Sequence, residues 1–165
     1  MNSTSLADEF PGYMALIRCA ALFHRAVDQA LAEHGDLTRV QFAILSYLST
    51  NPEGLRMFEL ADRMVHSRNG LTYQIKQLEK TGLVTRSPGT NNERAVVAKI
   101  TEEGHRIHDS LLAQHSELVR TQFFDVLSAE ELATITNGLD RVAKRLDEYT
   151  KTHTNHESPK KDSPA

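Results

Sequence analysis

Residues 67–101 read SRNGLTYQIKQLEKTGLVTRSPGTNNERAVVAKIT, and this stretch decides the fold. Ser67 is a residue type that caps the N-termini of helices. Apolar residues recur behind it at helical spacing, at Leu71, Ile75 and Leu78. Gly82 follows, and glycine is common just past the end of a helix. The first part of the stretch therefore predicts one capped amphipathic helix.

A β-hairpin is expected directly after this helix. Two β-branched runs, Leu83–Arg86 and Ala95–Ile100, flank SPGTNNE, whose Pro, Gly and Asn residues favour a long hairpin loop. Upstream, LRMFELADRMV at 55–65 predicts a short helix, with one apolar face formed by Met57, Leu60, Ala61 and Met64. This order is typical of a winged helix-turn-helix, whose second helix enters the DNA major groove.

The outer face of the Ser67 helix carries groups that recognise nucleic acid. Asn and Gln pair with adenine, Thr meets the thymine methyl group, and Lys and Arg bind phosphate or guanine. Every amphipathic helix has a polar face, but this one carries only one carboxylate, Glu79. The predicted DNA-contacting residues, including two hairpin arginines, are Ser67, Arg68, Asn69, Thr72, Tyr73, Lys76, Gln77, Arg86 and Arg94.

Helical periodicity extends on both sides of this unit. Further helices are expected over 13–34, behind a Thr38 cap, behind Thr101 and behind a Ser128 cap. The predicted fold is mainly α with a small β-hairpin wing, containing six helices and forming an intertwined homodimer. We expect a flexible arm at 1–9, a single domain at 10–150 and a disordered tail at 151–165. Within the domain, 36–100 form the DNA-binding lobe and 10–35 and 101–150 the dimerisation helices.

The charge is unevenly distributed along the chain. The formal net charge is −3, which by itself argues against a polyanionic partner. Residues 56–99, however, carry eight basic and four acidic side chains, a net +4, which leaves −7 for the remainder. DNA binding requires a local positive surface rather than a basic total. The basic charge is concentrated in the stretch where periodicity places the winged helix.

Length and composition exclude several other classes. The chain has 165 residues, about one domain, with 39% hydrophobic and 25% charged residues, as in ordinary globular proteins. No membrane span or signal peptide is recognisable, and the single cysteine, Cys19, fits a reducing compartment, so we expect a cytoplasmic protein. None of the motifs GxGxxG, GxxxxGK[ST], HExxH and GxSxG occurs, so we expect neither an enzyme nor a cofactor.

The stretch RMFELADRMVHSRNGLTYQIKQLEKTGLVTR, followed by NERAVVAKITEEG, resembles the multiple antibiotic resistance regulator (MarR) family of bacterial winged-helix regulators. The resemblance covers about residues 13–149. It is carried by Leu60-Ala61, Ser67-x-x-x-Leu71-Thr72, Leu78-Glu79-Lys80-x-Gly82-Leu83-Val84, and the run from Arg94 into Ile100-Thr101-x-x-Gly104.

The resemblance implies a regulator that binds double-stranded DNA as a two-fold homodimer, more often a repressor than an activator. The dimer would be built from the first and last two helices and would read a pseudo-palindromic operator. Phe10, Phe123 and Phe124 are candidates for its core. Arg94 matches the family arginine that enters the minor groove, but the acidic residue that usually accompanies it is Asn92 here.

The family also implies a small aromatic or anionic effector that binds between the dimerisation helices and the DNA-binding lobe. The candidate pocket residues are Phe23, His24, Val27, Phe42, Leu45 and His66, although apolar residues at helical spacing are equally typical of a core.

Two features allow other sensing chemistries. Some relatives sense peroxides through a cysteine of the first helix, but their accompanying tyrosine is Arg39 here, so a buried inert Cys19 is favoured. His105, His108 and His115 could bind zinc from one helix face, but a solvated histidine face is favoured and no metal is predicted. A redox- or zinc-responsive regulator and a dimeric winged-helix protein-interaction module without DNA binding remain as alternatives.

Overall fold

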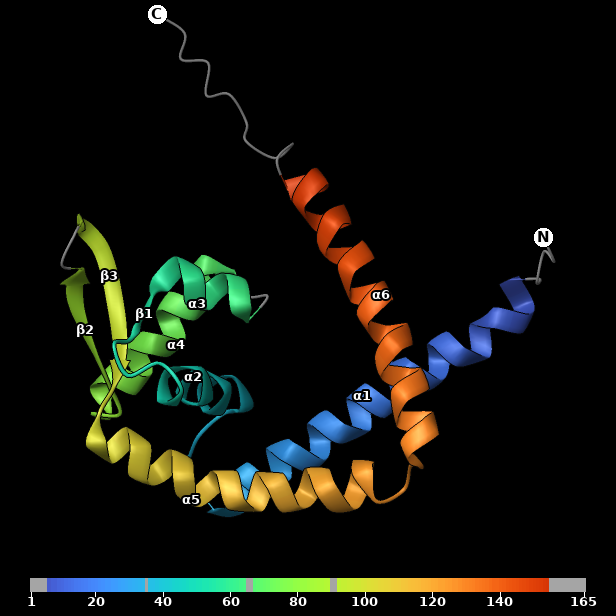
Figure 1. Ribbon diagram of the computed structural model, residues 1–165. Coiled ribbons are helices and arrows are strands. Elements are labelled where there is room, and N and C mark those ends of the chain that lie inside the picture. Colours follow the sequence, from blue (N-terminus) through green and yellow to red (C-terminus); the bar gives the residue numbers. More distant parts are fainter. Residues whose placement is uncertain (1–5, 35, 65–66, 90–91, 155–165) are drawn as a thin grey trace, which may run out of the picture. The chain divides into compact units, whose positions relative to one another are not determined.

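The computed structural model describes residues 6–34, 36–64, 67–89 and 92–154, except for the side chains at 6–9, 34, 68, 92–94 and 154 (Figure 1). The chain divides into two compact units, Met1–Leu118 and Val119–Ala165, which are described in turn. The elements are α1 (Leu6–His34), α2 (Arg39–Ser49), β1 (Leu55–Arg56), α3 (Met57–Arg63), α4 (Arg68–Lys80), β2 (Val84–Gly89), β3 (Asn92–Ile100), α5 (Glu102–Val119), the π-helix η1 (Arg120–Phe124) and α6 (Ala129–Thr154).

The first unit contains a lobe in which α2, α3 and α4 pack with a three-stranded antiparallel sheet of order β1-β3-β2 (Figure 1). Its core is aliphatic, and several of its side chains are fully shielded from solvent: Ile44, Leu45, Leu48, Leu60, Ile75 and Leu78. Each shielded Leu or Ile contributes about 1.5–3 kcal/mol through burial. The predicted winged helix-turn-helix fold is confirmed.

The hairpin differs from its prediction in two respects. β2 continues to Gly89 and β3 begins at Asn92, so only residues 90–91 separate the strands and the expected long loop is wrong. Pairing continues through polar residues because the ladder uses backbone groups, and Pro88 lies on the edge strand, where its missing N–H is tolerated. The two-residue strand β1, which pairs Leu55 with Ala98, was not predicted because it is too short for a periodic signal.

The predicted helix caps are present. Thr38 forms a capping box with Gln41, in which each side chain bonds the other residue's backbone N–H. Thr101 Oγ1 accepts the Gly104 N–H at 3.0 Å at the start of α5, and Ser128 pairs reciprocally with Glu131 at the start of α6. These short polar side chains position the helix starts where the sequence indicated.

A second apolar cluster of the first unit joins α1, α2 and α5. It is formed by Val27, Leu31, Phe42 and Leu111. The helix α1 begins at Leu6, inside the arm expected at 1–9 and earlier than the predicted start at Tyr13. Pro11 does not prevent this because it lies in the second turn, where it forfeits a single intrahelical hydrogen bond.

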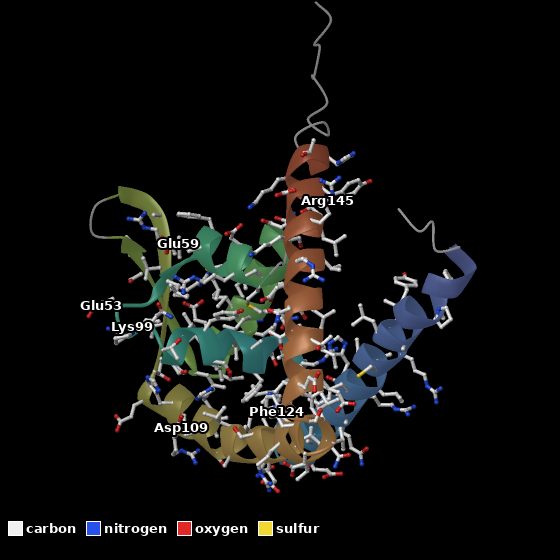
Figure 2. The ribbon with its side chains drawn as sticks, turned by 45° about the vertical axis from the view of Figure 1, so that its right-hand side comes forward. Glu53, Glu59, Lys99, Asp109, Phe124 and Arg145 are labelled. Carbon is white, nitrogen blue, oxygen red and sulfur yellow. The ribbon has the colours of Figure 1, made fainter. Side chains whose placement is uncertain are left out.

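The second unit consists of η1 and α6. The side chains of α6 project on all sides of the helix, Arg145 among them (Figure 2). Its apolar residues recur every three or four positions and are all at least one-third exposed: Ile135, Leu139, Val142, Leu146 and Tyr149. The helix also runs to Thr154, into the tail expected from residue 151, while residues 155–165 lie outside the described part of the chain.

Candidate nucleic-acid interface

The helix α4 has one buried face and one exposed face. Ser67 caps it as predicted, because its Oγ accepts the Gly70 N–H at 3.2 Å. The buried side chains are Leu71, Ile75 and Leu78. On the other side Asn69, Tyr73 and Lys76 are exposed, and Tyr73 retains 60% of its accessible surface, while Thr72 and Gln77 are half-buried. The face predicted to contact DNA is therefore the face that α4 presents to solvent.

The hairpin leaves α4 through a tightly bonded turn. Gly82 has a φ of +74°, and the N–H groups of Gly82 and Leu83 donate to the carbonyls of Glu79 and Leu78, both at 3.0 Å. This is the Schellman arrangement, in which a left-handed residue ends a helix. Thr101 closes the base from the other side, since its Oγ1 donates to the Gly82 carbonyl at 2.7 Å.

Two of the predicted DNA contacts, Glu79's neighbour on the sheet and the wing-tip arginine, differ in what the structure describes. Arg86, on β2, donates through Nε and Nη2 to the same carboxylate oxygen of Glu79, at 2.9 and 2.5 Å. The backbone of Arg94 belongs to β3, but its side chain and that of Arg68 lie outside the described atoms. The sequence gave no signal for the Glu79–Arg86 pair.

An open cavity of about 530 Å³ lies between α1, α2 and α5 of the first unit. Four of the six predicted pocket residues line it: Phe23, His24, Val27 and Phe42. Leu45 does not, because it is fully buried in the core of the lobe, and His66 lies outside the described residues. Sequence reasoning missed Arg39, Ser46, Tyr47 and His115, which line the cavity as well.

The expected solvated histidine face on α5 is wrong. His108 is only 3% exposed, with Nε2 at 3.2 Å from Ser46 Oγ and Nδ1 at 3.0 Å from Asp109 Oδ1. Its ring stacks on Phe42, because the α5 face that carries it packs against α2. Desolvation lowers the pKa of His115 below its ordinary value. Among the described residues no cluster of His, Cys, Asp or Glu side chains could hold a metal ion.

Cys19 is exposed in the single chain, so the expectation of a buried cysteine is wrong for the isolated protomer. The reason is that α1 enters the core only through its C-terminal half, at Val27 and Leu31. Its N-terminal half instead exposes large apolar side chains: Phe10, Tyr13, Met14, Leu16, Ile17 and Leu22.

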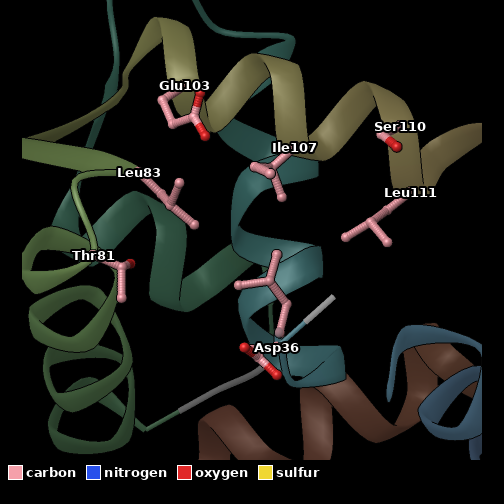
Figure 3. Close-up of a pocket in the computed structure, with 8 residues that line it drawn as sticks. Asp36, Thr81, Leu83, Glu103, Ile107, Ser110 and Leu111 are labelled. Atoms are coloured by element: carbon pink, nitrogen blue, oxygen red, sulfur yellow. The ribbon is translucent and has the colours of Figure 1, made fainter. Parts of the chain in front are cut away.

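A second, smaller cavity of about 290 Å³ was not predicted. Figure 3 shows Leu83, Ile107 and Leu111 pointing into it, with Asp36 and Glu103 at opposite ends. The Glu103 carboxylate is bound by Arg106 at 2.6 and 2.7 Å, and these hydrogen bonds lower the pKa of Glu103. One of its two acidic groups is therefore already paired within α5.

A recognition helix with an exposed polar face, followed by a β-hairpin, defines a winged helix-turn-helix protein. A model of the MarR family matches residues 35–95. The HTH-type transcriptional repressor Rv2887 of Mycobacterium tuberculosis H37Rv is 32% identical over 142 residues, which cover 86% of this chain and 94% of that protein. The transcriptional activatory protein BadR of Rhodopseudomonas palustris is 29% identical over 137 residues, which cover 82% of this chain and 76% of that protein.

Solved structures agree. The crystal structure of Sco3205, a MarR family transcriptional regulator from Streptomyces coelicolor in complex with DNA, matches with a TM-score of 0.83 and 26% identity, covering 88% of this chain and 92% of that one. The chain belongs to the MarR family of transcriptional regulators. In the described part of the molecule, no helix has the length and apolar character needed to cross a bilayer.

Proposed function

We propose that this regulator binds double-stranded DNA with α4 in the major groove. The observation that carries the proposal is the exposed face of α4, where Asn69, Tyr73 and Lys76 stand opposite the buried stripe. Amide, hydroxyl and ammonium groups on one helix face suit base edges and phosphates. The proposed contacts are those predicted from the sequence, with Ser67 at the helix start.

Arg94 is proposed as the wing contact with the minor groove. Its backbone lies on β3 next to residues 90–91, at the end of the hairpin remote from the lobe core. An arginine at that end of a hairpin is placed to enter a narrow minor groove, where the negative potential is strongest.

We further propose that the protein acts as a homodimer on a pseudo-palindromic site. The support is the apolar surface that each unit leaves uncovered, along Phe10–Leu22 of α1 and along Ile135–Tyr149 of α6. Contiguous exposed apolar surface of this kind marks an interaction surface. Phe10 and Phe124, both about half exposed, belong to it. A two-fold dimer would present two α4 helices to successive major grooves.

The test is selection of bound genomic fragments, followed by fluorescence anisotropy on the enriched site. We expect one enriched palindromic sequence and an affinity that falls steeply with salt, with a slope of about −0.9 per phosphate neutralised. Arg94→Ala should weaken binding about 10-fold or more, whereas Arg145→Ala, which removes the same charge from an exposed position on α6, should not. Enrichment of no sequence would favour the protein-interaction module and would contradict the proposal.

Repression is the proposed direction of regulation, supported by the name of Rv2887, although BadR is named as an activator. The family consists of regulators, so we propose a cytoplasmic protein without catalytic activity. A promoter containing the enriched site, fused to a reporter, should become more active when the gene is deleted. Lower reporter activity in the deletion strain would identify an activator.

A second proposal concerns the 530 Å³ cavity, which fits a small aromatic or anionic effector. Its volume lies in the range of small-molecule sites, and Phe23 and Phe42 supply aromatic surface while Arg39 supplies a cation. We expect 4-hydroxybenzoate or a related acid to raise the melting temperature and to weaken DNA binding. Ala43→Leu, which fills part of the cavity, should abolish both effects while DNA binding persists.

A further inference from the structure

The ion pair between α4 and β2 is an unexpected feature of the candidate interface. Arg86 Nε and Nη2 both bond Glu79 Oε2, at 2.9 and 2.5 Å. The side chains retain 28% and 36% of their exposure, so the pair is partly shielded from water. Two nitrogens of the guanidinium group point at α4, and this fixes the side chain in one orientation.

Glu79 is also unexpected for its charge. It is the only carboxylate among the residues of α4, the helix proposed to meet DNA. A negative charge close to phosphates opposes binding, so electrostatics alone predicts that its removal strengthens the complex. A carboxylate at this position therefore needs another physical reason.

The geometry points to the attachment of the wing. The base of the hairpin is already held by Gly82, by Thr101 and by the buried Val84. Arg86 lies further along β2, opposite Ala98, and β2 is an edge strand paired on one side only. The bond to Glu79 therefore connects the last turns of α4 to the hairpin at a point beyond its base. Two attachment points restrain the tilt of a hairpin, whereas one leaves it free to pivot.

We propose that Glu79 and Arg86 are positioning residues that hold the wing at a fixed angle to α4, so that Arg94 reaches the minor groove while α4 occupies the major groove. The proposal rests on the proposed DNA-binding function. It also revises the role expected for Arg86 from the sequence, since Arg86 acts through the orientation of the hairpin and not as a phosphate contact.

The test compares variants of the full chain on the selected DNA site. Glu79→Gln should weaken binding about 3- to 10-fold, although it removes a negative charge. Asp62→Asn, which removes an exposed carboxylate of α3 in the same lobe, should leave affinity unchanged or slightly raised. Arg86→Gln should match Glu79→Gln, and the double variant should be no weaker than either single variant, because both changes break one pair.

The salt dependence distinguishes positioning from phosphate contact. A lost phosphate contact makes the slope of log K against log[salt] shallower by about 0.9, whereas a lost orientation lowers affinity at constant slope. We expect Arg86→Gln to keep the wild-type slope. The exchanged pair Glu79→Arg/Arg86→Glu should recover part of the affinity. A shallower slope for Arg86→Gln, or binding by Glu79→Gln as tight as wild type, would overturn the proposal.

Hydrogen exchange of the free protein provides a readout that does not depend on DNA. In Glu79→Gln, the paired amides of residues 87–89 and 95–97 should exchange faster, while those of Val84 and Ile100 at the base should not. Unchanged exchange along the whole hairpin would contradict the positioning role even where DNA affinity falls. Failure of the wild-type protein to bind DNA would instead contradict the proposed function, with the exchange result still deciding the role of the pair.

Discussion

Gly82 provides a direct test of how the wing is joined to the recognition helix. Its φ of +74° lies in the left-handed region, and its N–H and that of Leu83 close the end of α4. A Cβ at this position would meet nothing within 4 Å. Gly82→Ala therefore isolates the cost of the backbone conformation from any steric clash.

The expected magnitude follows from two opposing effects. An L-residue in the left-handed region costs about 1–2 kcal/mol. Alanine also restricts the unfolded chain, which offsets about 0.4–1 kcal/mol of that cost. The net loss should be about 1 kcal/mol, or about 2–4 °C in Tm for a chain of this size. Gly82→Asn should lose less than Gly82→Ala, because asparagine tolerates the left-handed region better than alanine does.

The assay is urea unfolding followed by circular dichroism, at one protein concentration for all variants because a dimer's stability depends on concentration. The order of stability should be wild type, then Gly82→Asn, then Gly82→Ala, with equal m-values. If Gly82→Ala were as stable as wild type, or if asparagine were worse than alanine, the left-handed turn would not be what joins α4 to β2.

Three further predictions concern other parts of the chain. Gly104→Ala should cost about 1–3 kcal/mol for a different reason, since a Cβ there would collide with the Leu83 carbonyl, and Gly104→Asn should be worse than alanine, the reverse of the order at Gly82 in the same assay. Leu146→Glu should shift the protein from dimer to monomer in sedimentation, because it charges the exposed apolar stripe of α6, whereas Arg145→Ala should not. The pKa of His115 is lowered by desolvation, so the unfolded chain takes up the proton first and stability should fall as pH drops below about 6.5; His115→Gln should reduce the difference in unfolding free energy between pH 7.5 and 5.5.

Local signals predicted most of the fold. Thr38, Ser67, Thr101 and Ser128 cap helices where the sequence indicated, because a cap depends on a side chain and backbone groups only three residues away. The buried face of α4 was equally predictable, since helical periodicity identifies the side that meets a core. The length of the hairpin was not, because backbone pairing through Ser87–Gly89 requires no apolar pattern.

The candidate site was less predictable, because its geometry depends on contacts between elements. Leu45 and Phe42 lie on the same helix and look alike in sequence, yet Leu45 is buried in the lobe core and Phe42 lines the open cavity. His108 looked solvent-facing by composition, but it contacts Ser46, which is 62 residues away in the chain. Neither outcome has a periodic signature, since each depends on which helix packs against which face.

The Glu79–Arg86 pair also changes what the charge count of the lobe means. The net +4 of residues 56–99 includes both partners, so pairing leaves the total unchanged. The cations available to phosphate are nevertheless fewer, because a guanidinium bound to a carboxylate releases no counterion when DNA arrives. Counting basic residues therefore overestimates the salt dependence of binding. The measured slope should instead follow cations on the outer surface, such as the exposed Lys76 of α4.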